Sequence, residues 1–201
     1  MSIMEGMEKI LLFRGRLRTL LTVAVAAMAT AGLSVSPAHA ALPVGQDVII
    51  SNYASNWYLS TDHQTVAENQ RVQIWDRDPM ANNGAGSIWR LTPRTDGSYS
   101  ISPSEPYGRT PQFCLSNEKD PNRSGEGAVW VRRCAGADSR QSWWIGETSS
   151  RSYIHTIIPA NDTGYALGPH RGLAAADVHV NVTRRQGGTS ATVQMWKINP
   201  A

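Results

Sequence analysis

The spacing of tryptophans is the feature of this sequence that most restricts its fold. Three short segments each carry a Trp with Leu or Ile two residues later, at Trp89, Trp143 and Trp196. The first two tryptophans are 54 residues apart and the last two are 53 apart. Side chains two apart in a strand share a face, so each segment predicts a strand that turns a Trp and an aliphatic side chain into a core. A repeat of this length predicts units that can bury their apolar faces only together.

Short alternating runs between turn-forming residues predict four strands in each unit. We place the units at roughly 44–95, 96–148 and 149–201, and Leu59, Leu115 and Leu167 fall at the same point in each. The expected strands are 48–52, 57–61, 71–76 and 87–92, then 98–102, 113–116, 128–133 and 141–146, then 153–158, 165–168, 178–183 and 192–199. Few segments show a helical period. The expected fold class is therefore all-β, with three pseudo-repeats of four strands.

The first forty residues predict a secretory signal peptide. A basic stretch precedes a segment rich in Leu, Val and Ala at 20–35, and Ala38-His39-Ala40 provides a cleavage site of small residues. A membrane anchor would need about twenty apolar residues, and Thr and Ser interrupt this run. We therefore expect secretion with cleavage after Ala40, one domain over 41–201, and no membrane span.

Most of the positive charge lies in the predicted signal peptide. The whole chain has 19 Lys+Arg and 16 Asp+Glu, and residues 1–40 hold four of the former and two of the latter. The remaining chain therefore has 15 and 14, a net charge of +1. A charge this small gives no reason to expect a nucleic-acid partner.

Cys114 and Cys134 are the two cysteines of the chain. In an exported protein an even count favours a disulfide, whereas two free thiols would fit a reducing compartment. Two cysteines without a neighbouring Cys or a pair of His do not form a metal ligand set. We therefore expect a disulfide and neither a metal nor another cofactor.

The tails of the units resemble a known family. Gln141-Ser142-Trp143 and Gln194-Met195-Trp196, with Ser87-Ile88-Trp89 as a weaker copy, resemble the Gln-x-Trp signature of ricin B-type β-trefoil lectins. Phe113-Cys114-Leu115 followed by Arg132-Arg133-Cys134 is similar to the disulfide of that family, which ties the second strand of a repeat to the end of its third. The resemblance implies a β-trefoil, a six-stranded barrel closed at one end by three hairpins.

The resemblance also implies a shallow sugar pocket in each repeat. An acidic side chain after the Leu of the second strand, an aromatic side chain in the third strand and an Asn-Gln pair before the last Trp would hold the sugar. This combination suits a sugar, because its ring has an apolar face and an edge of hydroxyls. The sequence meets the pattern only in part. The candidate carbohydrate-binding residues are Ser60, Asp62, Gln73, Trp75 and Asn82 in the first repeat, Ser116, Asn117, Arg132 and Gln141 in the second, and Gln194 in the third.

The departures from the family pattern differ between repeats. In the first, Gln73 and Trp75 match, but Ser60 occupies the acidic position and Gly86-Ser87 the Asn-Gln position, so Asp62 and Asn82 or Asn83 would have to substitute. In the second, Ser116 and Arg132 replace the acidic and stacking residues. In the third, Gly168 and either Val180 or Asn181 do so. The first repeat is thus the best candidate.

Structural roles compete with these assignments. The three repeated Trp are expected in the barrel core, and their Gln neighbours are expected to satisfy buried backbone groups. Trp75 and Trp130 fit packing and surface display equally well. Arg132-Arg133 and Arg184-Arg185 are typical of solvated faces, although an Arg-rich rim would suit sulfated or sialylated glycans.

No catalytic motif is present in the sequence. The histidines after the signal segment are scattered, and neither a His-Glu-x-x-His nor a Gly-x-Ser-x-Gly pattern occurs. We expect a secreted carbohydrate-binding module that is not an enzyme and whose partners are cell-surface glycans or polysaccharides. The alternative is a cell-binding or partner-binding subunit of a multi-component bacterial toxin, whose sugar pockets have degenerated and which holds a toxin or enzyme protein. A glycoside hydrolase, which needs two carboxylates across a cleft, is the third choice.

Overall fold

The computed structural model describes residues 42–76, 79, 86–104, 112–120, 122, 124–148 and 151–201. All of these belong to one compact unit, Ala38–Ala201. The predicted signal segment and the candidate residues Asn82 and Asn83 lie outside the described residues.

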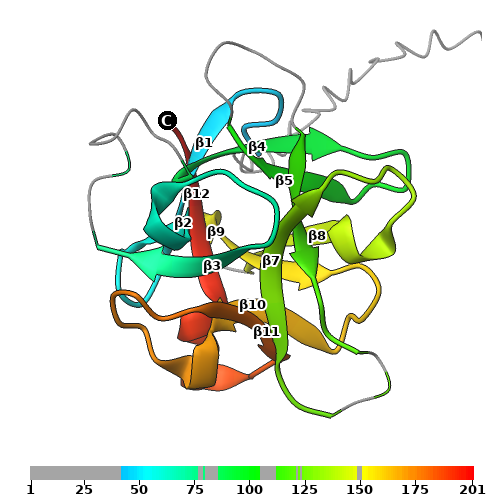
Figure 1. Cartoon of the computed structure of the whole chain (residues 1–201). Helices are drawn as coiled ribbons and strands as arrows, with labels where there is room; N and C mark the ends of the chain where they lie inside the picture. The colour runs from blue at the N-terminus through cyan, green and yellow to red at the C-terminus, as the bar shows by residue number, and fades with distance from the viewer. Residues whose placement is uncertain are drawn as a thin grey trace, which may run out of the picture. The chain divides into compact units, whose positions relative to one another are not determined.

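Twelve β-strands and four short 3-10 helices follow one another in the described part of the chain (Figure 1). Each of the twelve strands overlaps one that the sequence predicts. Their bounds are β1 Asp47–Asn52, β2 Tyr58–Thr61, η1 Asp62–Gln64, β3 Gln70–Trp75, β4 Ile88–Pro93, β5 Tyr99–Pro103, β6 Phe113–Asn117, β7 Gly127–Arg133, η2 Ser139–Gln141, β8 Trp143–Thr148, β9 Arg151–Pro159, β10 Tyr165–Pro169, η3 His170–Gly172, β11 Val180–Arg184, η4 Gly188–Gln194 and β12 Met195–Pro200.

Six strands form a closed antiparallel barrel. β1 pairs with β4, β4 with β5, β5 with β8, β8 with β9, β9 with β12, and β12 returns to β1. Figure 1 shows the closure directly, because the red β12 lies alongside the blue β1 although the two come from opposite ends of the domain. Closure leaves no unpaired edge among these six strands.

The other six strands form three hairpins, β2–β3, β6–β7 and β10–β11. The second strands of these hairpins meet one another at corresponding positions. Arg71 of β3 pairs with Trp130 of β7, Ala128 of β7 pairs with Asn181 of β11, and His179 before β11 pairs with Gln73 of β3. In each of these pairs, the second residue stands two positions later in its own repeat than the first residue does in its repeat. Side chains from three distant parts of the sequence are thereby brought to one junction.

The three repeated tryptophans lie in the core that the sequence pattern predicts for them. Trp89, Trp143 and Trp196 are each 0% exposed. Their indole Nε1 atoms donate to the carbonyl oxygens of Leu59, Leu115 and Leu167, at 2.8, 3.0 and 3.0 Å. The indoles therefore fill the core and also satisfy three buried carbonyls of the hairpins.

The ends of three predicted strands are wrong. The segments before the second and third Trp, including Gln141 and Gln194, form the 3-10 helices η2 and η4 and not strands. The strand predicted from residue 178 begins at Val180, because Asp177 has a φ of 60° that interrupts an extended chain. Apolar residues alternate across two of these boundaries, at Val178 and Val180 and at Val193 and Met195, so the pattern alone does not mark them.

The disulfide is confirmed. Cys114 and Cys134 are bonded, 20 residues apart, and link the start of β6 to the residue after β7. Because every residue of β6 is paired with β7, the bond fastens a hairpin that backbone hydrogen bonds already define.

Acid is expected to weaken the fold through His155 of β9. Its side chain is 2% exposed, and its Nδ1 has no hydrogen-bond partner among the described residues. Burial lowers the pKa of His155 from its ordinary 6.5, and the charge of Glu147 opposes this only in part. The unfolded chain therefore binds a proton at a pH where the folded protein does not. Stability should be full above the ordinary pKa and fall as the pH drops below it, by up to about 1.4 kcal/mol per pH unit.

Urea unfolding between pH 7 and pH 5 measures this dependence. The variant His155→Gln cannot titrate at this position, so its stability should fall less steeply over the same range. Equal slopes for the two proteins would contradict the assignment to His155.

Candidate functional site

The first hairpin carries the aromatic and amide pair predicted from the sequence. Gln73 and Trp75 lie two apart on β3, opposite Ser60 and Tyr58 of β2. Ser60 is 0% exposed and its Oγ lies 2.8 Å from Ser87 Oγ, so its hydroxyl is used inside the protein. Gln73 is 2% exposed, but its Nε2 has no partner among the described residues. Trp75 is half-buried.

Asp62 lies just after β2, at the start of η1. Its carboxylate is close enough to Arg71 and His179 to favour their charged forms. Burial nevertheless lowers the pKa of Arg71, and burial together with the charge of Arg71 lowers that of His179. Asp62 thus supplies a negative charge near Arg71 and His179 at the junction of the hairpins, which is a different place from the one the family pattern gives its acidic residue.

The candidate residues of the second hairpin make internal contacts. Ser116 and Asn117 are 0% exposed. The hydroxyl of Ser116 donates to Glu118 Oε1 at 3.0 Å, and Asn117 Oδ1 accepts from the backbone N–H of Lys119 at 2.9 Å. Arg132 donates through Nε to the same Glu118 oxygen at 3.2 Å and lies 5.2 Å from the centre of the Trp130 ring. These groups hold the end of the β6–β7 hairpin together.

The Gln residues before the second and third Trp bind backbone. Gln141 Nε2 donates to the carbonyl of Arg133 at 2.7 Å, and its Oε1 accepts from the N–H of Ala135 at 2.7 Å. Gln194 Nε2 donates to the carbonyl of Arg184 at 2.8 Å, and its Oε1 accepts from the N–H of Gln186 at 2.9 Å. Both side chains are 2% exposed. The sequence predicts this structural role as the alternative to sugar binding for Gln141 and Gln194, and the hydrogen bonds agree with it.

The hairpin register settles the corresponding positions in the third repeat. Trp75, Arg132 and Thr183 pair with Tyr58, Cys114 and Ala166, each of which comes directly before the Leu that recurs in every repeat. Asn181 pairs with Gly168, as Gln73 pairs with Ser60. The third repeat therefore has Thr183 in the stacking position and Asn181 in the amide position, so the prediction of Val180 or Asn181 in the stacking position is wrong.

A polar network crosses the junction of the three hairpins. Arg71 donates to Asn181 Oδ1 at 3.0 Å and lies 5.0 Å from the centre of the Trp130 ring. Asn181 Nδ2 in turn donates to Glu126 at 2.8 Å, and Glu126 also lies 2.6 Å from His170 Nδ1 and accepts from the N–H of Arg171 at 3.0 Å. Burial favours the protonated form of Glu126, but these hydrogen bonds outweigh it and lower its pKa. Glu126 is therefore ionised and fully engaged within the protein.

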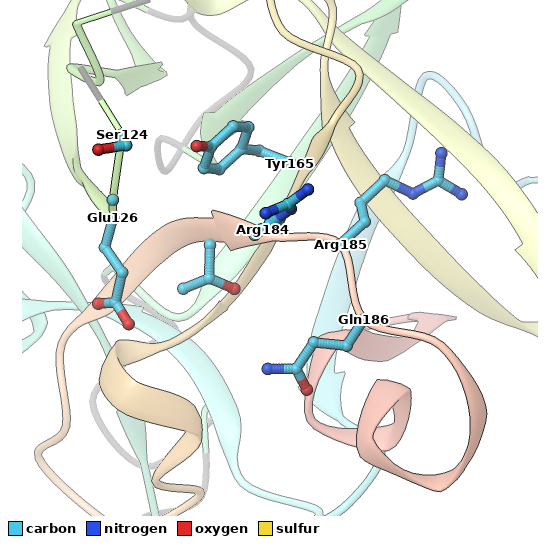
Figure 2. Close-up of a pocket in the computed structure, with 8 residues that line it drawn as sticks. Ser124, Glu126, Tyr165, Arg184, Arg185 and Gln186 are labelled. Atoms are coloured by element: carbon cyan, nitrogen blue, oxygen red, sulfur yellow. The ribbon is translucent and has the colours of Figure 1, made fainter.

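A pocket of about 440 Å³ opens beside this network, between the loop before β7 and the ends of β10 and β11. Figure 2 shows Arg184 between Tyr165 and Gln186, with Glu126 on the opposite wall and Arg185 extending away from it. Its lining residues are Ser124, Gly125, Glu126, Tyr165, Thr183, Arg184, Arg185 and Gln186. The combination of one aromatic ring, the Arg184 guanidinium and several neutral polar groups can bind a polar ligand.

Sequence reasoning did not find this pocket. The sequence predicts Arg184 and Arg185 as a solvated face or as an Arg-rich rim suited to sulfated or sialylated glycans, and it gives no role to Glu126 or Tyr165. A signal was present, since an Arg stands at or just after the end of the third predicted strand in both units, Arg133 in the second and Arg184 in the third. The approach of the loop at 124–126 to Arg184 depends on how the hairpins pair, which the spacing of residues along the chain does not give.

The described residues contain no group of three or more His, Cys, Asp and Glu side chains placed to hold a metal ion. Within the same residues, no helix has the length and apolar character needed to cross a membrane.

Comparison with solved structures identifies the fold. The chain superimposes on a designed threefold-symmetric protein, ThreeFoil, with a TM-score of 0.62 and 15% identity over 77% of this chain and 99% of the other. It superimposes on the Rhizoctonia solani agglutinin with a TM-score of 0.60 and 14% identity over 80% and 97%. A mosquitocidal holotoxin matches with a TM-score of 0.62 and 16% identity over 78% of this chain and 17% of the toxin. No protein-family model and no curated protein matches the sequence.

These similarities show that the chain has a β-trefoil fold. At 14–16% identity they show the fold alone, and the residues of this chain must carry any argument about function.

Proposed function

We propose that this protein is a secreted carbohydrate-binding module of the ricin B type with no catalysis of its own. The observation that carries the proposal is the pair Gln73 and Trp75 on one face of β3, where the amide Nε2 of Gln73 is buried without a partner among the described residues. The presence of an agglutinin among the proteins of similar fold supports it.

The pair has the chemistry that a sugar requires. An indole offers a flat apolar surface for the C–H face of a pyranose ring, and an amide donor two residues away reaches its hydroxyl edge. A buried donor without an acceptor costs free energy, and a ligand hydroxyl at Gln73 would recover it. Asp62 lies near the start of β3, where its charge acts on Arg71, and not at the end of β3 that carries Trp75.

We infer that the segments 44–95, 96–148 and 149–201 are repeats of one unit. The corresponding hydrogen bonds from three Trp to three Leu carbonyls and the corresponding pairings of β3, β7 and β11 support this division. We also infer that residues 1–40 are removed on export after Ala40. Mass spectrometry of the protein recovered from the culture medium of its native host tests the cleavage, because a mature chain that begins elsewhere than Ala41 would contradict it.

Replacing Trp75 with Ala is expected to weaken glycan binding by about 1–3 kcal/mol, because the stacking surface and its burial are lost together. The measurement is a glycan array followed by titration of the best ligand. Trp144→Ala is the matched control, since this Trp is 37% exposed on the barrel strand β8. No signal on the array, or an equal loss in both variants, would contradict the assignment to Trp75.

A second function is a partner-binding subunit of a toxin. It is supported by the similarity to a domain-sized part of the mosquitocidal holotoxin and by the internal use of Ser60, Ser116 and Asn117, which leaves the sugar positions incomplete. A pull-down from the native host would yield a stable complex in this case. Recovery of the protein alone, together with a positive glycan array, would favour the lectin.

A further inference from the structure

Arg184 stands in the pocket between the second and third hairpins without an ionic partner. It is exposed, and no carboxylate among the described residues pairs with its guanidinium. Glu126 lines the same pocket, but His170, Asn181 and the N–H of Arg171 already occupy its oxygens. A cation that faces a concave surface without a counter-ion can take an acidic group from a ligand.

The corresponding place between the first and second hairpins contains an internal ion pair. There β3 and β7 pair through Gln70 and Val131, and two residues outward from each lie Glu68 and Arg133. Arg133 Nε donates to Glu68 Oε2 at 3.2 Å. In this arrangement the chain provides its own carboxylate for the arginine.

At the pocket, the position that corresponds to Glu68 is occupied by a glycine. β7 and β11 pair through Gly127 and Val182, so two residues outward from each lie Gly125 and Arg184. Gly125 replaces the Glu68 of the other junction. A Cβ built at Gly125 would meet no atom within 4 Å, so the space that a carboxylate could fill is open. The pocket thus lies where the internal carboxylate is missing.

The remaining walls of the pocket suit a sugar ring. Tyr165 pairs with Arg184, as Phe113 pairs with Arg133, so this junction has a phenol in place of a phenyl ring. Figure 2 shows the Tyr165 hydroxyl directed toward the side of Ser124, with Gln186 on the other side of Arg184. A hydroxyl and an amide on either side of a cation can bind the hydroxyl groups of a saccharide that carries an acid.

We propose that this pocket binds the acidic group of a saccharide, a carboxylate or a sulfate, on Arg184. The choice of a saccharide rests on the proposed carbohydrate-binding function, whereas the acidic group follows from the missing counter-ion. The guanidinium presents a planar fork of donors that matches two oxygens of either group. The pocket is distinct from the Gln73 and Trp75 surface, which belongs to the β2–β3 hairpin.

Three forms of one sugar test the proposal by NMR on the mature chain. Glucose, glucuronic acid and glucose 6-sulfate differ only in the group at carbon 6. We expect the two acidic sugars to shift the Arg184 Nε–H signal and the Tyr165 ring signals in a saturable way, and we expect glucose to bind about tenfold more weakly or not at all. A comparison of the two acidic sugars tells which acid fits better. Added salt should weaken both.

Two arginine variants separate the pocket from general charge. Arg184→Gln should abolish the response of Tyr165 to the acidic sugars. Arg133→Gln, its matched control, removes the same charge at the corresponding position of the preceding junction and should leave the response unchanged. Equal responses to glucose and to the acidic sugars, or equal losses in both variants, would overturn the proposal.

The failure of this proposal can be told apart from the failure of the proposed function. If Trp75→Ala abolishes array binding while the acidic sugars leave Arg184 unshifted, the lectin function stands and the acidic pocket is refuted. If the array is blank while the acidic sugars shift Arg184 in a saturable way, the pocket stands and the function proposed for the Trp75 surface is refuted.

Discussion

Replacing Trp143 with Ala is expected to lower the free energy of unfolding by about 3–5 kcal/mol, which is a large part of the stability of an ordinary domain. Trp143 is 0% exposed and lies on β8 within the closed barrel. Its removal deletes a large apolar side chain from a closely packed core, and the surrounding strands are held by their ladder hydrogen bonds and cannot collapse onto the space.

The lost hydrogen bond adds to the cavity. The Nε1 of Trp143 donates to the carbonyl of Leu115 at 3.0 Å, so the Ala variant leaves a buried acceptor of β6 unsatisfied. The carbonyl belongs to the hairpin and the indole to the barrel. The substitution therefore loosens the attachment of the hairpin as well as the packing of the core.

Urea unfolding followed by circular dichroism measures the effect. Trp144→Ala is the matched control, because it removes the same side chain from the next residue of the same strand, where it is 37% exposed. A change below about 1 kcal/mol is expected for the control. Similar losses for the two variants would contradict the core role of Trp143.

The fold followed from the sequence because its strongest signals are local and repeated. Trp89, Trp143 and Trp196 recur with the leucines that accept their hydrogen bonds, and alternation of apolar residues marks both members of each pairing. Repetition lets an ambiguous strand be placed by comparison with its two counterparts. The 3-10 helices that contain Gln141 and Gln194 could not be read in this way, because a single turn has too few residues to show a period.

The candidate site was harder to predict because it depends on contacts between hairpins. Gln141 and Gln194 match the family signature in sequence, but their amides bind backbone, and only coordinates distinguish this role from ligand binding. The pocket at Arg184 depends on a missing side chain at Gly125. Nothing in the sequence distinguishes Gly125 from other loop glycines. Only a comparison of the β7–β11 pairing with the β3–β7 pairing shows that Gly125 occupies the position of Glu68.

Removing the disulfide is expected to lower the free energy of unfolding by roughly 3 kcal/mol on the loop-entropy account. The bond joins Cys114 and Cys134 and closes a loop with a sequence separation of 20 residues. Its absence leaves the folded hairpin paired along β6 and β7 but gives the unfolded chain more conformations, so the loss comes mainly from the unfolded state.

The double variant Cys114→Ala and Cys134→Ala tests this expectation without a reductant. For a domain of this size the change corresponds to a fall in Tm of roughly 6–12 °C. The folded spectrum at low temperature should match that of the unmodified protein, because Trp143 and its bond to Leu115 remain in place. Unchanged Tm would refute the assigned stabilisation. A lost folded spectrum would show instead that the bond is needed to form the hairpin, since backbone pairing would then be too weak to hold β6 against β7 alone.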